Sequence, residues 1–81
     1  MSRDEVVVKV NDFLIDEFEL EEEQLMPKAL MKEDLDIESL DFVDIAVIIE
    51  RDFGLKVTSE QMIKIKKLED LYNFILEHSK N

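Results

Sequence analysis

Residues 34–44 read Asp-Leu-Asp-Ile-Glu-Ser-Leu-Asp-Phe-Val-Asp, and an acidic loop gives way there to an apolar helix. Ser39 lies at this junction, among carboxylates. A hydroxyl at the first turn of a helix, surrounded by charged groups, is poorly placed for a hydrophobic core and well placed for modification by another protein. The function of the chain therefore depends on whether Ser39 carries a covalently attached group.

The helix that begins near Ser39 is expected to end at Phe53, because Gly54 is a typical residue just past a helix C-terminus. Its apolar side chains are too many for one stripe. Spacings of three and four residues place one set toward the core. That set is Phe42, Ile45, Ala46, Ile49 and Phe53. Leu40, Val43 and Val47 lie on a different face, either under the preceding loop or exposed for docking.

A first helix is predicted over residues 3–18. Ser2 and Glu5 form the pattern of a capping box, and apolar residues then recur at helical spacing. The apolar stripe consists of Val6, Val7, Val10, Phe13, Leu14 and Phe18.

Residues 19–37 are expected to form a long connection, which is unusual in so short a chain. Pro27 and a run of carboxylates interrupt any helical pattern, apart from a brief helical turn at residues 28–32. The anchors that tie the connection to the core are predicted to be Leu25, Leu30, Leu35 and Ile37.

After the second helix, Thr58 and Gln61 form another capping-box pattern and predict a short helix with Met62 and Ile63 buried. A last helix is predicted from Leu68 to His78. Its stripe contains Leu71, Tyr72 and Ile75. The expected fold is all-α, a small four-helix bundle of three main helices and one short helix with a long first loop. We expect residues 1–81 to form a single domain.

The net charge of −11 arises from 21 acidic and 10 basic side chains. Such a chain repels nucleic acid and anionic lipid, so its partners should present basic surfaces. No apolar run approaches the ~20 residues needed to span a bilayer, and no secretory leader is visible. We expect a cytoplasmic monomer that neither binds nucleic acid nor inserts into membranes. The absence of cysteine excludes disulfides and thiolate chemistry by the chain itself.

Catalysis and specific metal binding fit the sequence poorly. The only histidine, His78, is near the C-terminus, and no Gly-x-Ser-x-Gly turn surrounds Ser39, so we expect no catalytic residues and no enzyme activity. Asp34, Asp36 and Glu38 alternate as in a calcium loop, but Ser39 and Ile45 stand where such a loop needs glycine and glutamate. Only weak, nonspecific divalent binding is expected. On spacing alone, a helix N-cap is the favoured explanation of Ser39, ahead of any function.

The order of the predicted elements changes this balance. With its long loop, its short third helix and the motif Asp34-Leu-Asp-Ile-Glu-Ser-Leu-Asp41, the chain resembles an acyl carrier protein over nearly its whole length. The signature of that family is Asp-Leu-Gly-x-Asp-Ser-Leu-Asp at the start of the second helix. The continuation from Phe42 to Gly54 is also similar to the family's second helix.

The resemblance implies that a separate transferase attaches 4′-phosphopantetheine from coenzyme A to Ser39, and that acyl groups are carried as thioesters on its thiol. Candidates for lining the acyl pocket are Ile45, Ile49, Met62 and Ile63, for which plain core packing is an equal alternative. Partner recognition would use Glu38, Leu40, Asp41, Val43, Asp44, Val47 and Glu50. The partners implied are the phosphopantetheinyl transferase and acyl-loading, ketosynthase or acyltransferase-type enzymes with basic docking surfaces.

Three departures from the family pattern point away from the general fatty-acid pathway. Glu38 replaces the usual Asp, Asp36 replaces the usual Gly, and Arg51 stands in a stretch that is usually acidic. They favour a specialised carrier for a lipid, polyketide or aryl-polyene type assembly line. Two alternatives remain: an unmodified helical interaction module, and a peptidyl or aminoacyl carrier with the same cofactor. The acidity of the second helix favours the acyl type.

Divalent cations should stabilise this chain. Between Glu33 and Asp52 there are eight carboxylates and one basic residue, Arg51. Self-repulsion among these carboxylates costs stability at low ionic strength. We therefore expect millimolar Mg²⁺ or Ca²⁺ to raise the melting temperature in a thermal melt. A melting temperature indifferent to divalent cations and to monovalent salt would contradict this expectation.

Overall fold

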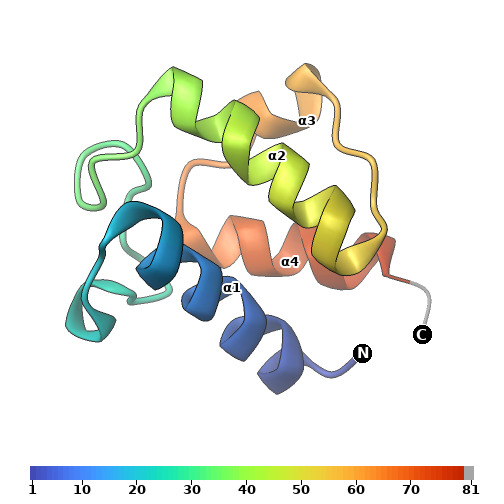
Figure 1. Cartoon of the computed structure of the whole chain (residues 1–81), viewed down its shortest axis with the longest axis horizontal. Coiled ribbons are helices and arrows are strands. Elements are labelled where there is room, and N and C mark those ends of the chain that lie inside the picture. Colours follow the sequence, from blue (N-terminus) through green and yellow to red (C-terminus); the bar gives the residue numbers. More distant parts are fainter. Residues whose placement is uncertain (80–81) are drawn as a thin grey trace.

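The computed structural model describes residues 1–79 and consists of helices joined by loops (Figure 1). The helices are α1 (Arg3–Phe18), α2 (Ser39–Phe53), α3 (Ser59–Ile63) and α4 (Leu68–His78), with a short 3₁₀ turn at Glu22–Gln24. Within this part of the chain there is no β-strand, only an isolated antiparallel bridge between Leu30 and Lys67. The predicted all-α, four-helix fold is confirmed.

Capping interactions set the helix ends where the sequence predicts them. At the start of α1, the Ser2 hydroxyl accepts a hydrogen bond from the Glu5 amide at 3.2 Å, and the Glu5 carboxylate accepts one from the Ser2 amide at 3.0 Å. Thr58 and Gln61 make the equivalent pair of bonds before α3. Gly54 ends α2 with φ of 69°, a left-handed conformation that costs glycine little.

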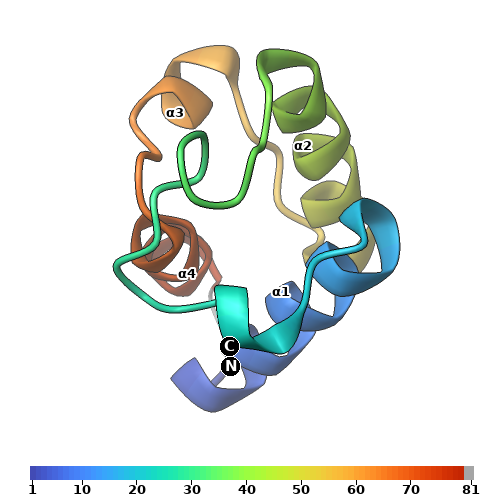
Figure 2. The ribbon, with the colours of Figure 1, turned by 90° about the vertical axis from the view of Figure 1, so that its left-hand side faces the viewer.

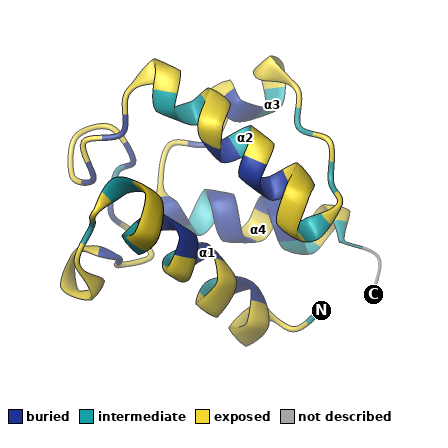
Figure 3. Cartoon of the chain, in the orientation of Figure 1, coloured by how far each residue is buried: buried dark blue, intermediate teal, exposed yellow. Residues whose placement is uncertain are grey.

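One hydrophobic core lies between the helices, and every buried side chain in it is apolar or is Tyr72 (Figure 3). Helix α1 packs beside α4, and α2 lies over both at the other face of the core (Figures 1 and 2). The sides of α1 and α4 that meet the core are apolar, apart from the hydroxyl of Tyr72. Within residues 1–79, no helix combines the length and the apolar character that crossing a bilayer requires.

Helix α2 divides its apolar residues much as expected. Ile45 and Ile49 are fully buried, whereas Phe42, Ala46 and Phe53 are half-buried against the core. Ile48, which the periodicity did not assign to either face, is also buried. The second set, Leu40, Val43 and Val47, is exposed.

Two local expectations are wrong. Ile63 is 66% exposed, because α3 is a single short helix that turns Met62, and not its neighbour, toward the core. No helix forms at residues 28–32; the connection has a 3₁₀ turn at Glu22–Gln24 and a single turn over residues 31–35, in which the Asp34 amide donates to the Leu30 carbonyl at 2.9 Å. Backbone groups near Leu30 are engaged elsewhere, since the Met31 amide donates to the Lys66 carbonyl at 2.8 Å and the Leu68 amide donates to the Ala29 carbonyl at 2.9 Å.

The long connection is thus tied to the start of α4. Leu25, Leu35 and Ile37 are buried as predicted, whereas Leu30 is only half-buried. The result is a fixed loop that approaches the N-terminal end of α2 (Figure 2).

Tyr72, the only tyrosine, should make stability fall at alkaline pH. Burial raises the pKa of Tyr72, and its hydrogen bond to Asn11 and the nearby Arg3 charge only partly oppose this rise. The folded state therefore favours the neutral phenol. The resulting stabilisation is complete below the unfolded pKa of about 10 and is lost as pH rises through the folded pKa.

Urea unfolding of the wild type and of Tyr72→Phe checks this expectation. The difference in unfolding free energy between the two should be constant below pH ~10 and should shrink above it. Phenolate absorbance, which reports Tyr72 alone, should rise at higher pH in the folded protein than in urea. Equal titration in both states would contradict the expectation.

Candidate functional site

Ser39 is the first residue of α2 and is exposed. The residue that caps the helix is its neighbour Glu38, with extended backbone angles of −94° and 169°. Asp41 Oδ2 accepts a hydrogen bond from the Glu38 amide at 2.9 Å and completes this cap. Ser39 is therefore not the N-cap, and the interpretation of its hydroxyl as a capping group is wrong.

The hydroxyl of Ser39 is free for chemistry. Within residues 1–79, none of the side-chain hydrogen bonds involves it. The amides of Asp41 and Phe42 donate to the Glu38 carbonyl, at 2.9 and 3.2 Å, whereas in the same part of the chain those of Ser39 and Leu40 have no backbone acceptor. Free amides at the positive end of a 15-residue helix favour an anion there.

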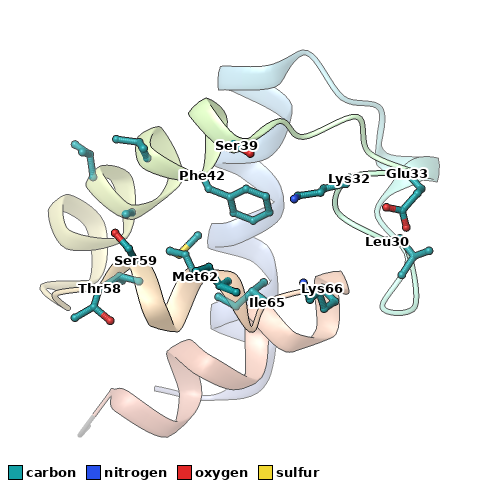
Figure 4. A pocket seen from close by; sticks show the side chains of 15 residues that line it. Leu30, Lys32, Glu33, Ser39, Phe42, Thr58, Ser59, Met62, Ile65 and Lys66 are labelled. Carbon is teal, nitrogen blue, oxygen red and sulfur yellow. The ribbon is translucent and has the colours of Figure 1, made fainter.

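Two hollows meet at Ser39. The larger, of about 660 Å³, is a groove between α2 and α3, and the connection closes one end of it (Figure 4). Its walls are mainly apolar, with Phe42 and Ala46 from α2 facing Met62 and Ile65 from the other side. The smaller hollow, of about 450 Å³, is formed by Lys32 and by residues 36–40. Ser39 lines both, so a group attached to it has direct access to the groove.

The groove only partly matches the residues proposed for it. Met62 and Ile63 line it, and the exposure of Ile63 is exposure to this groove. Ile45 and Ile49 do not line it, because they point into the core and are fully buried. The sequence placed Phe42 and Ala46 on the core face and did not identify them as residues that line the groove. They form the border between the buried and the exposed faces of α2. A helical wheel of α2 contains that signal, since residues on the border of two apolar stripes face a neighbouring element.

The docking residues suggested by the sequence lie along the exposed side of α2, where Val43 and Val47 also line the groove. Leu40, Val43 and Val47 are 79%, 60% and 62% exposed, and Glu38, Asp44 and Glu50 are exposed beside them. Asp41 differs, because it is half-buried and its carboxylate is engaged by the Glu38 amide. Arg51 pairs with Asp52 at 3.0 Å, and this contact offsets part of its positive charge.

Nothing beside Ser39 resembles a catalytic pair. His78 lines neither hollow, its Nδ1 lies 2.9 Å from the Phe74 carbonyl, and its ring stacks on Phe74 with centroids 4.3 Å apart. Among the described residues there is no group of three or more His, Cys, Asp or Glu that could hold a metal ion. An accessible hydroxyl at a helix N-terminus, opening into an apolar groove, suits a covalently attached anionic arm that carries an apolar group.

Comparison with known proteins supports this view. Residues 9–75 match a family described as the phosphopantetheine attachment site. The chain is 32% identical over 77 residues to an acyl carrier protein of Petrotoga mobilis, covering 95% of this chain and 91% of the relative. It is 30% identical over 78 residues to an acyl carrier protein of Lactobacillus acidophilus, covering 96% and 98%.

A shorter match reaches 48% identity over 40 residues with an acyl carrier protein of Rickettsia bellii, covering 49% of each chain. The extent of the two longer matches, together with the family match over most of the chain, is sufficient to assign the family. The chain belongs to the acyl carrier protein family, whose phosphopantetheine-binding domain carries covalently attached 4′-phosphopantetheine, and it is a carrier and not a catalyst.

Proposed function

We propose that Ser39 is the attachment point of 4′-phosphopantetheine and that this chain presents acyl thioesters to biosynthetic enzymes. The observation that carries the proposal is the position of the Ser39 hydroxyl, exposed at the first residue of α2, released from capping by Glu38, and bordering both hollows. In the modification, Ser39 Oγ would attack the pantetheine-bearing phosphorus of coenzyme A. The new Oγ–P bond replaces the bond to the nucleotide phosphate, and the transferase accepts the serine proton.

After modification, the chain itself would orient the arm and shelter the acyl group. The arm supplies the thiol that this cysteine-free chain lacks and holds acyl groups as thioesters. The free amides at the start of α2 favour the negative charge added at Ser39. The groove offers apolar walls to the acyl chain, with Met62 and Ile63 as contacts. Ile45 and Ile49 lie one layer deeper and would contact cargo only if the groove opened into the core.

Partner enzymes would dock on the exposed strip of α2. Leu40, Val43 and Val47 provide apolar contacts, while Asp44 and Glu50 attract basic surfaces and raise encounter rates. The partners we propose are the phosphopantetheinyl transferase and acyl-loading, ketosynthase or acyltransferase-type enzymes.

The departures from the family motif support a specialised lipid or polyketide pathway over general fatty-acid synthesis. Asp36 adopts φ of 56° where the family has glycine, a conformation that Asp tolerates better than most residues. The loop before Ser39 therefore keeps its shape while gaining a carboxylate. A partner enzyme that contacts this loop would therefore bind next to an additional negative charge, which a carrier with glycine at this position lacks.

Intact-mass spectrometry tests the attachment. After incubation with coenzyme A and a broad-specificity phosphopantetheinyl transferase, the wild type should gain the mass of one phosphopantetheine. Ser39→Ala should gain none, because it lacks the attacking oxygen. Ser59→Ala is the matched control, since Ser59 also is exposed and lines the groove. Failure of several transferases to modify the wild type would refute the proposal.

Truncation of the exposed apolar strip should slow modification without unfolding the chain. For Leu40→Ala and Val47→Ala we expect kcat/KM of the transferase to fall roughly fivefold or more, as for a central interface residue. The melting temperature should hardly change, because both side chains are exposed. Val8→Ala, on α1 and 58% exposed, should leave kcat/KM unchanged. Equal effects of the three substitutions would argue against docking through α2.

A further inference from the structure

Lys32 is held in place by the backbone of the long connection. The Ile37 amide donates to the Met31 carbonyl at 2.9 Å, and the Met31 amide donates to Lys66 across the connection at 2.8 Å. Met31 and Ile37 are buried. Within the same turn, Asp34 Oδ2 accepts from the Leu30 amide at 2.8 Å. The position of Lys32 is therefore fixed by a closed turn between two buried anchors, although its own side chain is exposed.

This turn places Lys32 beside the start of α2. The two hollows have two lining residues in common, Lys32 and Ser39. Lys32 and Ser39 therefore both lie where the two hollows adjoin. Figure 4 shows the Lys32 side chain extending from the loop toward the Phe42 ring, with Ser39 drawn above that ring.

The negative charge around Ser39 makes the position of Lys32 important. From Glu33 to Asp52 the chain carries eight carboxylates, and the one basic residue there, Arg51, is paired with Asp52. A phosphodiester added at Ser39 would bring one more negative charge into this region, next to Glu38 and Asp41. Within residues 1–79, Lys32 takes part in no ion pair. Its ammonium group is therefore available to offset that charge at close range.

We propose that Lys32 is a positioning residue that binds the phosphodiester of the arm and holds the first part of the arm beside the groove, where the two hollows adjoin. This inference rests on the proposed attachment at Ser39. Lys66 also lines the groove, but it lines only that hollow and does not border the second one with Ser39. Because Lys32 would act on the arm and not on its cargo, its effect should be present before any acyl group is loaded.

Nuclear magnetic resonance of the unloaded protein tests this inference. The side-chain signal of Lys32 can be assigned in the apo protein by its loss in Lys32→Met. On conversion of the wild type to the holo form, the Lys32 signal should shift clearly, and high salt should reduce the shift. The signal of Lys28, in the same connection but lining neither hollow, should barely move. An unchanged Lys32 signal, or equal shifts at both lysines, would overturn the inference.

The phosphorus signal of the holo protein provides the second readout. In Lys32→Met the phosphodiester resonance should lose most of its displacement from the position it has in the urea-unfolded holo protein. Lys32→Arg should restore the displacement, and Lys28→Met should leave it intact. The same resonance in the wild type and Lys32→Met would refute a phosphate contact. A Lys32 response that occurs only after loading a carboxylate-bearing acyl group would refute it as well and would assign Lys32 to cargo.

Intact mass, measured before these spectra, separates the two proposals. If the wild type accepts no phosphopantetheine, or if Ser39→Ala accepts it, the attachment proposal fails and the role of Lys32 falls with it. If the wild type is modified at Ser39 and the Lys32 signals do not respond, the attachment stands and only the role of Lys32 is wrong.

Discussion

The backbone amide of Glu38 donates to Asp41 Oδ2, and this hydrogen bond determines where α2 begins. Glu38 therefore occupies the N-cap position, and the hydroxyl of Ser39, one residue further along, takes no part in capping. A capping serine has its oxygen turned toward the helix amides and is poorly available to another protein. At this N-terminus the N-cap is Glu38, whose side chain makes no capping bond, and the Ser39 and Leu40 amides have no backbone acceptor within residues 1–79. The separation of capping from reactivity leaves Ser39 Oγ accessible and leaves the positive helix end beside it.

The path of the long connection toward α2 depends on a second set of hydrogen bonds, which join backbone groups. Backbone hydrogen bonds join residues 29–31 to residues 66–68. They hold the connection against the start of α4. This attachment closes one end of the groove and places Lys32 at the border of the groove that Ser39 also lines. The groove is thus built from three separate parts of the chain. Its shape depends on the start of α4, which contributes nothing to the chemistry at Ser39.

Much of the fold was accessible from the sequence because it depends on local signals. The starts of α1 and α3 follow from capping boxes, and the end of α2 follows from Gly54. The position of the 3₁₀ turn and the exposure of Ile63 were not accessible, because long-range backbone bonds and the shortness of α3 decide them. For the site, the importance of Ser39 came from its motif. The placement of Lys32 came only from the structure, since nothing local links it to α2.

The two walls of the groove differ in how firmly they are held. Helix α3 has five residues and buries one of them, Met62, whereas α2, the opposite wall, buries Ile45, Ile48 and Ile49. Because each fully buried large apolar side chain contributes about 1.5–3 kcal/mol, displacing α3 exposes less apolar surface than displacing α2. A bulky acyl group would therefore enlarge the groove at the least cost by moving α3, while Ser39 and the docking strip on α2 stay in place.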